Sequence, residues 1–219
     1  MIDPITKSQI SVLELNAARP LVICDVDEVV MHFLRGLEEF LDENGLWLDP
    51  ASFALNGNIK YKNSHTPLPG SEIGGTLEQF FKERVGSLDP IDGAADALSK
   101  FSEHADVIML TNMPDAYRGE RIDNLRDHGM VYPVVSNSGP KGPSVRHIAE
   151  MIERPVVFID DTPSNVNSVT EHASSVHVLH FMQDQRFRRH LPEMTQILAS
   201  VDNWDDGTAH VLRAVGGRS

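Results

Sequence analysis

The chain has 219 residues, 41% of them hydrophobic and 23% charged, which is typical of a globular protein built as one large domain or as a core with an insertion. Its formal net charge of −13 would repel nucleic acids and anionic membranes, so we expect neither as a partner. The sequence has no apolar run of the roughly 20 residues that a membrane span needs, and its first segment lacks the basic start and apolar middle of a signal peptide, so we expect a cytoplasmic protein.

The first predicted strand covers residues 20–26, a short apolar and β-branched run. An amphipathic helix is predicted over 31–45. Residues 55–75 are rich in Gly, Asn and Pro and have no clear periodicity, so we predict a loop there. Two helices follow, at 76–86 and 90–104, and the second leads to the next strand.

This long interruption after the first strand predicts an inserted cap. Long segments of this kind within compact domains are usually functional lids or disordered. We predict that residues 32–90 form a small, mainly helical cap over the strand ends, and that residues 1–31 and 91–219 form the core. The alternative is an elaborated connection that has no role in substrate choice.

The remainder of the chain alternates between strands and helices. Helix starts and stops are marked by residues such as Pro114 and Asp115 at one end and Gly129 at the other. Such alternation predicts an α/β fold, a doubly wound parallel sheet whose functional sites form at the carboxyl ends of the strands. The predicted strands are 105–111, 131–136, 154–160 and 175–181, and the predicted helices are 114–129, 142–153 and 162–173.

Four carboxylates are expected at that edge of the sheet. Asp25 and Asp27 come where the first strand ends, and Asp160 and Asp161 end the strand at 154–160. Like charges this close repel one another, so a cation or a shifted protonation must hold them together. Oxygen ligands of this kind suit Mg²⁺, which binds through one or two carboxylates, water and substrate phosphate.

Such a group of residues can perform phosphoryl transfer. One aspartate can attack phosphorus and form an aspartyl-phosphate, while the second protonates the leaving oxygen and later takes a proton from water. Thr111 would donate its hydroxyl to a phosphoryl oxygen, and Lys141 would neutralise the developing charge. The structural alternatives are turns or helix caps for the aspartates, a strand end for Thr111 and a solvated loop for Lys141.

These residues resemble the four motifs of the haloacid dehalogenase (HAD) superfamily. They occur in the family's order and span roughly residues 20–170. Together they are far more specific than any single Asp-x-Asp pair. The matching segments are Asp25-Val26-Asp27-Glu28-Val29, VIMLTN with Thr111, Lys141 near a helix start, and VVFIDDTPSN with Asp160 and Asp161.

The resemblance implies a HAD-type phosphoric monoester hydrolase with a C1-type cap. Asp25 would be the nucleophile and Asp27 the general acid and base. Magnesium would be held by the Asp25 carboxylate, the Asp27 backbone carbonyl and one of Asp160 or Asp161, of which we favour Asp161. Asn165 would help to orient these ligands.

The predicted function is therefore a magnesium-dependent phosphatase of a small phosphorylated metabolite. The alternatives are a 5′-nucleotidase or deoxyribonucleotidase, a phosphomutase and, outside the enzymes, a receiver-like phospho-signalling module or a non-catalytic binding protein. The oligomeric state stays open. The residues expected to contact substrate are Thr111, Asn112, Lys141, Lys60 and Lys62.

Overall fold

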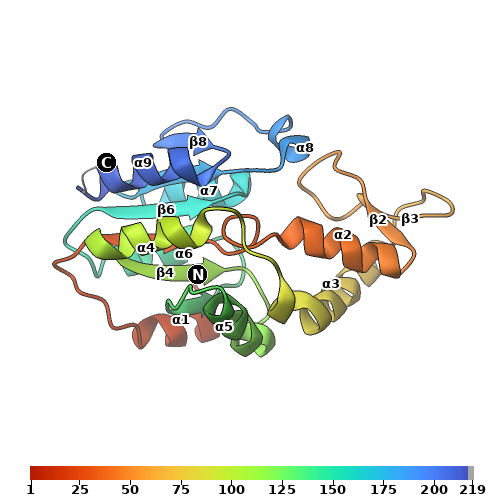
Figure 1. Ribbon diagram of the computed structural model, residues 1–219, viewed down its shortest axis with the longest axis horizontal. Helices are drawn as coiled ribbons and strands as arrows, with labels where there is room; N and C mark the ends of the chain where they lie inside the picture. The colour runs from red at the N-terminus through yellow and green to blue at the C-terminus, as the bar shows by residue number, and fades with distance from the viewer. Residues whose placement is uncertain (217–219) are drawn as a thin grey trace.

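A six-stranded parallel sheet forms the centre of the molecule (Figure 1). The computed structural model describes residues 1–216. The strand order is β5-β4-β1-β6-β7-β8, with β1 between β4 and β6. This arrangement confirms the predicted α/β fold with a parallel sheet. The strands are β1 (Leu21–Cys24), β4 (Asp106–Thr111), β5 (Val134–Ser136), β6 (Val156–Asp160), β7 (His177–Phe181) and β8 (Ala199–Val201).

Helices cover both faces of the sheet because alternate strand residues point to opposite sides. On β1, Leu21 and Ile23 belong to a core cluster with residues of α1, α6 and α7, whereas Val22 and Cys24 belong to a cluster with residues of α4 and α9. Every residue of β1 is buried. The helices are α1 (Pro4–Ser11), α4 (Ala94–His104), α5 (Arg118–Asp127), α6 (Gly142–Ala149), α7 (Pro163–His172), α8 (Gln185–Arg188) and α9 (Trp204–Ala214), with a 3₁₀ turn η2 (Asp115–Tyr117) before α5.

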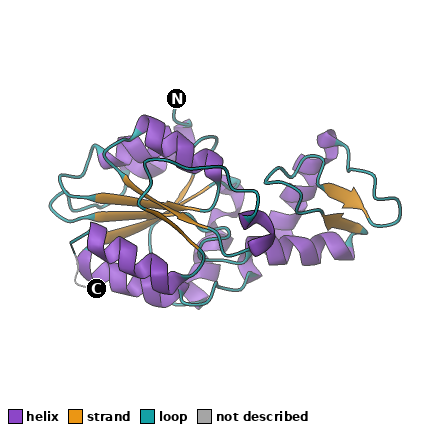
Figure 2. Cartoon of the chain, turned by 90° about the horizontal axis from the view of Figure 1, so that it is seen from above, coloured by secondary structure: helices purple, strands orange, loops and turns teal. Residues whose placement is uncertain are grey.

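Residues 33–87, between β1 and α4 in the chain, form an inserted segment that extends to one side of the sheet (Figure 2). Aromatic side chains join its two long helices: Phe80 of α3 lies 5.1 Å from Phe33 and 5.8 Å from Phe40 of α2, centroid to centroid. The predicted boundary of the cap at 32 and 90 stays a prediction. The elements of this segment are α2 (Phe33–Glu43), β2 (Leu46–Leu48), β3 (Ile59–Tyr61), α3 (Gly70–Arg84) and the 3₁₀ turn η1 (Val85–Ser87).

The predicted loop at 55–75 is wrong in two places. Part of it is strand β3, which pairs antiparallel with β2, and its last residues form the first turns of α3. Helix α3 begins after Pro69, at Gly70, instead of at residue 76. The glycines at 74 and 75 are exposed and weaken a helix only by about 1 kcal/mol each, which the packing of α3 against α2 offsets.

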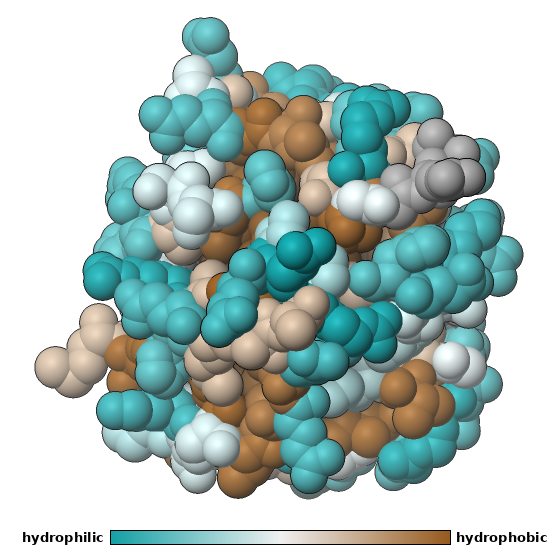
Figure 3. All heavy atoms as spheres, turned by 90° about the vertical axis from the view of Figure 1, so that its left-hand side faces the viewer, coloured by the Kyte–Doolittle hydropathy of each residue, from teal (hydrophilic) through white to brown (hydrophobic). Residues whose placement is uncertain are grey.

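The end of the core opposite this segment has a mixed surface (Figure 3). Hydrophobic residues appear there in patches that hydrophilic residues interrupt. Scattered exposed hydrophobic residues are normal on protein surfaces. Within residues 1–216, no helix combines the length and the apolar composition needed to cross a bilayer.

Candidate active site

A tight turn after β1 positions the first two aspartates. The backbone N–H of Asp25 donates to the carbonyl of Ile159 in β6 (2.9 Å), which extends the pairing of the strands by one residue. The carbonyl of Val26 then accepts hydrogen bonds from the N–H groups of Val30 and Met31, each at 2.9 Å. The chain thus turns immediately after Asp25, and both Asp25 and Asp27 line one cavity.

Lys141 links the first and fourth motifs. It is fully buried at the start of α6, and its Nζ lies 2.7 Å from Oδ1 of Asp25 and 2.7 Å from Oδ2 of Asp160. The next residue, Gly142, packs directly against α7. A Cβ at this position would come within 2.2 Å of the Ser168 carbonyl oxygen, so a larger residue would not fit. Glycine therefore allows α6 to approach α7 closely enough for Lys141 to reach both carboxylates.

Asp160 and Asp161 at the end of β6 have different surroundings. Asp160 is fully buried and accepts hydrogen bonds from Lys141, from the Thr162 N–H (2.9 Å) and from Nδ2 of Asn165 (3.2 and 3.3 Å). The Asp161 carboxylate is half-buried, and within the described part of the chain it accepts a hydrogen bond only from the Thr162 hydroxyl (3.1 Å). Asn165 thus orients Asp160, and Asp161 has the oxygen that is freer to bind a cation.

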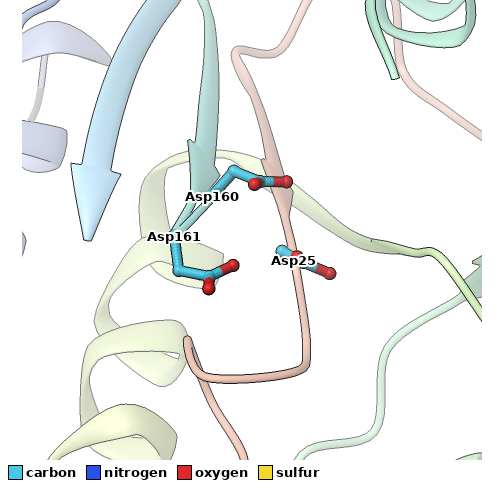
Figure 4. Close-up of side chains that lie close together, drawn as sticks. All are labelled: Asp25, Asp160 and Asp161. Carbon is cyan, nitrogen blue, oxygen red and sulfur yellow. The ribbon is translucent and has the colours of Figure 1, made fainter. Parts of the chain in front are cut away.

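Three carboxylates converge at this point (Figure 4). One oxygen each of Asp25, Asp160 and Asp161 lies within 4.8 Å of the others, so the group could hold a metal ion. Figure 4 shows Asp160 and Asp161 directed toward Asp25 from the neighbouring strand. Carboxylate oxygens in this arrangement are the ligands that hard divalent cations prefer.

The charges at this site are not balanced by the protein alone. Burial raises the pKa of Asp25 from 3.8 to about 8, although Lys141 opposes the shift. Burial and the neighbouring Asp160 also raise the pKa of Asp161 well above its usual range. Burial alone would lower the pKa of Lys141, but Asp160 and Asp25 raise it above its ordinary value. One ammonium group therefore faces three carboxylates, and a divalent cation would supply the missing positive charge.

Thr111 ends β4 and Asn112 follows it, at the same edge of the sheet. Thr111 is fully buried, and its Oγ1 has no hydrogen-bond partner among residues 1–216. An unpaired buried hydroxyl is costly. Thr111 does not itself line the cavity that contains Asp25, so its contact with a phosphoryl oxygen stays a prediction. Asn112 lines the cavity, and its side chain is fixed by Gly139 (3.0 Å) and Asn137 (2.7 Å).

The structure does not bring Lys60 and Lys62 to the carboxylates. Lys60 forms an ion pair with Asp49 (2.6 Å), and Lys62 forms one with Asp42. Neither lysine lines the cavity that contains Asp25. Their role in substrate binding stays a prediction that the geometry does not favour, because acidic partners within the inserted segment already neutralise both.

Two further residues support the aspartates, and the sequence analysis did not find these roles. Arg121 of α5 is fully buried, and its Nη2 contacts Oδ1 of Asp27 at 2.5 Å. His180 of β7 is also buried, and its Nε2 lies 2.8 Å from the carbonyl of Asp161. In sequence, Arg121 is one of several charged residues on a helix, so nothing there distinguishes it from a solvated residue.

Glu28 is a third residue of this kind. It has φ of +58°, in the left-handed region where a residue other than glycine is uncommon. Its buried carboxylate accepts the Leu34 N–H at the start of α2 (2.6 Å), and burial raises the pKa of Glu28 from 4.5 to about 7. Glu28 therefore connects the turn that carries Asp27 to the first helix of the inserted segment.

Asp25, Asp27 and Asp161 line a cavity of about 330 Å³, whereas the fully buried Asp160 does not. Asp25, Asp27, Asn112 and Asp161 provide polar groups in it, and the inserted segment provides apolar walls. A volume of this size is at the small end of ligand pockets. The arrangement can bind a small ligand against a nucleophilic carboxylate and a group of metal-binding oxygens.

The chain resembles several solved structures over nearly its whole length. A haloacid dehalogenase-like protein of unknown function from Agrobacterium tumefaciens is 16% identical, with 90% of this chain and 99% of that one covered and a TM-score of 0.61. A HAD family hydrolase from Deinococcus radiodurans, solved with bound phosphate and sodium, is 14% identical, with 91% and 97% covered and a TM-score of 0.60. A Bacillus subtilis protein assigned to the HAD hydrolases and bound to magnesium is 16% identical, with 90% and 99% covered and a TM-score of 0.59.

Sequence comparison alone does not find these similarities. No protein-family model matches the chain, and no curated protein sequence matches it. At the low identities above, the structural likeness establishes a shared fold, and the chemistry has to be argued from the residues of the site.

Proposed function

From the premise that the chain has the haloacid dehalogenase fold, we propose that it is a magnesium-dependent phosphatase that hydrolyses a small phosphorylated metabolite. The observation that supports this most strongly is the position of the buried Lys141, whose Nζ lies 2.7 Å from Asp25, which lines the cavity, and 2.7 Å from Asp160, which precedes Asp161. Aspartyl-phosphate chemistry needs a nucleophilic carboxylate, a fixed positive charge and further acidic groups in one place.

In the first step, Asp25 attacks phosphorus. Its Oδ1 is held by Lys141 and by the Val26 N–H (2.7 Å), so Oδ2 is the oxygen available for attack. The new bond joins Oδ2 to phosphorus, the bond between phosphorus and the ester oxygen breaks, and the Asp27 carboxyl gives its proton to the leaving oxygen. The Thr111 hydroxyl donates to a phosphoryl oxygen.

In the second step, water hydrolyses the aspartyl-phosphate. Asp27, now a carboxylate, takes a proton from the attacking water, and the Asp25 carboxylate leaves phosphorus. Arg121 holds Asp27 in place between the two steps through its contact with Oδ1. The released products are inorganic phosphate and the alcohol, and both aspartates return to their starting states.

Magnesium fits the acidic end of the cavity. Carboxylate oxygens of Asp25 and Asp161, the Asp27 backbone carbonyl and the neighbouring Asp160 would hold it. When bound, the ion supplies positive charge that neutralises the carboxylates and the phosphoryl oxygens. Asp161 is our preferred direct ligand because Asp160 already accepts hydrogen bonds from Lys141, Thr162 and Asn165.

A generic aryl phosphate tests the activity. We expect the purified protein to hydrolyse this ester in the presence of Mg²⁺. Excess EDTA should lower the rate at least about 100-fold, and adding Mg²⁺ back should restore the rate. Phosphate release gives the rate. A panel of phosphorylated metabolites measured in the same way covers substrates that an aryl ester does not represent. A rate that EDTA leaves unchanged, or no hydrolysis of any phosphomonoester in Mg²⁺, would contradict the proposal.

The stabilising effect of Mg²⁺ is expected to increase with pH. The pKa of Asp25 is about 8 in the folded protein, against an ordinary value of 3.8 that applies to the unfolded chain. Between these two pH values the folded state therefore binds one more proton than the unfolded state. The metal-free protein therefore loses stability as the pH rises through that window, and a cation that binds the carboxylates competes best at high pH. Thermal unfolding at about pH 5 and about pH 8 measures this. A rise in Tm on adding Mg²⁺ that is equal at the two pH values, or larger at the lower one, would contradict the charge arrangement described here.

A further inference from the structure

The cavity has an apolar wall that the proposed chemistry does not use. The wall comes mainly from the inserted segment, with a smaller part from the core near α8. Several of its side chains are only half-buried, so they keep apolar surface facing the cavity. Apolar surface of this kind favours contact with an apolar ligand. The residues that matter most are Phe33 of α2, Phe53 and Leu55 between β2 and β3, Leu77 and Phe81 of α3, and Phe187 of α8.

The same cavity offers no free positive charge. Among the described residues that line it, none is a lysine, an arginine or a histidine. The nearby cations have acidic partners: Lys141 is buried between two carboxylates, and Arg121 is buried against Asp27. In the adjoining pocket that shares Glu28 and Leu34, Arg186 pairs with Glu38 and Asp184, and Arg35 lies 3.9 Å from Asp89. A second anionic group on a ligand would meet no counter-charge and would lie near Glu28, which also lines the cavity.

We propose that the substrate is the phosphomonoester of an uncharged, apolar alcohol, whose alkyl or aryl group packs against this wall. The inference rests on the proposed function, because that function places the phosphoryl group at Asp25 and so directs the leaving group toward α2 and α3. Phosphorylated acids, bisphosphates and polar sugar phosphates are then poor substrates, since they would bury charged or hydroxyl groups against phenylalanine and leucine side chains without partners.

A series of primary alkyl phosphates tests the apolar wall without changing the chemistry of the leaving oxygen. We expect kcat/KM to rise about threefold for each added methylene, and so by roughly 80-fold from ethyl phosphate to hexyl phosphate. Adding a terminal carboxylate to the hexyl chain should lower kcat/KM at least about 10-fold. Values that stay within about twofold along the series, or a carboxylate that improves kcat/KM, would overturn the inference.

A matched pair of esters tests whether the site prefers an uncharged leaving group. Phosphocholine and 3,3-dimethylbutyl phosphate have nearly the same shape, and only phosphocholine carries a positive charge on its leaving group. We expect the neutral ester to have the higher kcat/KM. A clear preference for phosphocholine would show that the aromatic side chains and Glu28 bind a cation, and this would overturn the assignment of an uncharged alcohol.

A variant of the wall should change this selectivity. Leu77→Lys places a cation in the cavity on α3, and we expect it to raise kcat/KM for the carboxylated hexyl phosphate relative to hexyl phosphate at least about 10-fold. Gln79→Lys is the matched control, because Gln79 is exposed on the same helix and does not line the cavity. Equal ratios in the two variants would count against the wall as the site of the leaving group.

Binding of alkylphosphonates separates this inference from the proposed function, because phosphonates are not hydrolysed. With the unaltered protein in Mg²⁺, calorimetry should show hexylphosphonate binding at least about 10-fold more tightly than ethylphosphonate. If that difference appears while no ester is hydrolysed, the apolar site stands and the proposed activity fails. If esters are hydrolysed but both phosphonates bind equally well, the activity stands and the apolar site fails.

Discussion

Asp25→Asn is expected to lower kcat for an aryl phosphate by roughly 1,000-fold or more, because it removes the attacking carboxylate. The side chain keeps nearly the same shape, so its packing against Lys141 and the turn after β1 should persist. The substitution also removes a buried carboxylate whose pKa is raised to about 8 by burial, so the metal-free variant should unfold at the same temperature as the unaltered protein or higher. Steady-state phosphate release and a thermal melt provide the two measurements.

Asp106→Asn is the matched control for this variant. Asp106 begins β4 at the other end of the same sheet and forms an ion pair with Arg19. The variant should retain kcat within about twofold, because Asp106 lies at the end of the sheet away from the site. Its stability should change little as well, because a partly exposed ion pair contributes little to the free energy of unfolding. If Asp25→Asn kept most of its turnover, or if the two variants lost comparable amounts, Asp25 would not be the nucleophile.

Lys141→Met is expected to cost stability as well as activity. Removing one partner of a buried ion pair leaves uncompensated charge and typically costs about 3–5 kcal/mol. In this site two carboxylates, Asp25 and Asp160, would lose the same ammonium group. We expect kcat to fall at least about 100-fold, because Lys141 would no longer neutralise the charge on Asp25 and on the phosphoryl group. Urea unfolding gives the free energy, and phosphate release gives kcat. Mg²⁺ should recover part of the lost stability, because it neutralises the same carboxylates.

Lys60→Met provides the comparison for Lys141→Met. Its ion pair with Asp49 is partly exposed and lies in the inserted segment, so its loss should cost about 1 kcal/mol or less. It should leave kcat for an aryl phosphate nearly unchanged. A Lys141→Met protein that was as stable as Lys60→Met would mean that the buried lysine does not balance Asp25 and Asp160.

The parts of the fold that sequence reasoning predicted well are those with strong local patterns. Strand β6, which ends at Asp160, is buried on both faces. Its apolar residues therefore form an unbroken run that is easy to recognise in the sequence. Strand β8, at the edge of the sheet beside β7, has three residues of which two are half-buried, and no comparable pattern marks it. The four motifs meet in space because parallel strands bring their carboxyl ends to one edge.

The parts that sequence reasoning missed depend on contacts between distant residues. The helix α3 begins at Gly70 although glycine disfavours helices, because packing against α2 outweighs local propensity. Lys141 was predicted at this site, but local spacing does not reveal the close approach of α6 and α7 at Gly142 that positions it. Arg121 lies 94 residues after Asp27 in the chain, so only the folded structure shows that they touch.

Locating the phosphoryl group is the most direct test of the proposal that Asp25 captures phosphorus. A single turnover with an aryl phosphate in Mg²⁺ would be quenched in acid and treated with borohydride, which reduces an aspartyl-phosphate to homoserine. Peptide mass spectrometry then identifies the modified position. We expect homoserine at position 25 and unmodified aspartate at position 27. Modification at 27, 160 or 161 with position 25 unmodified would contradict it.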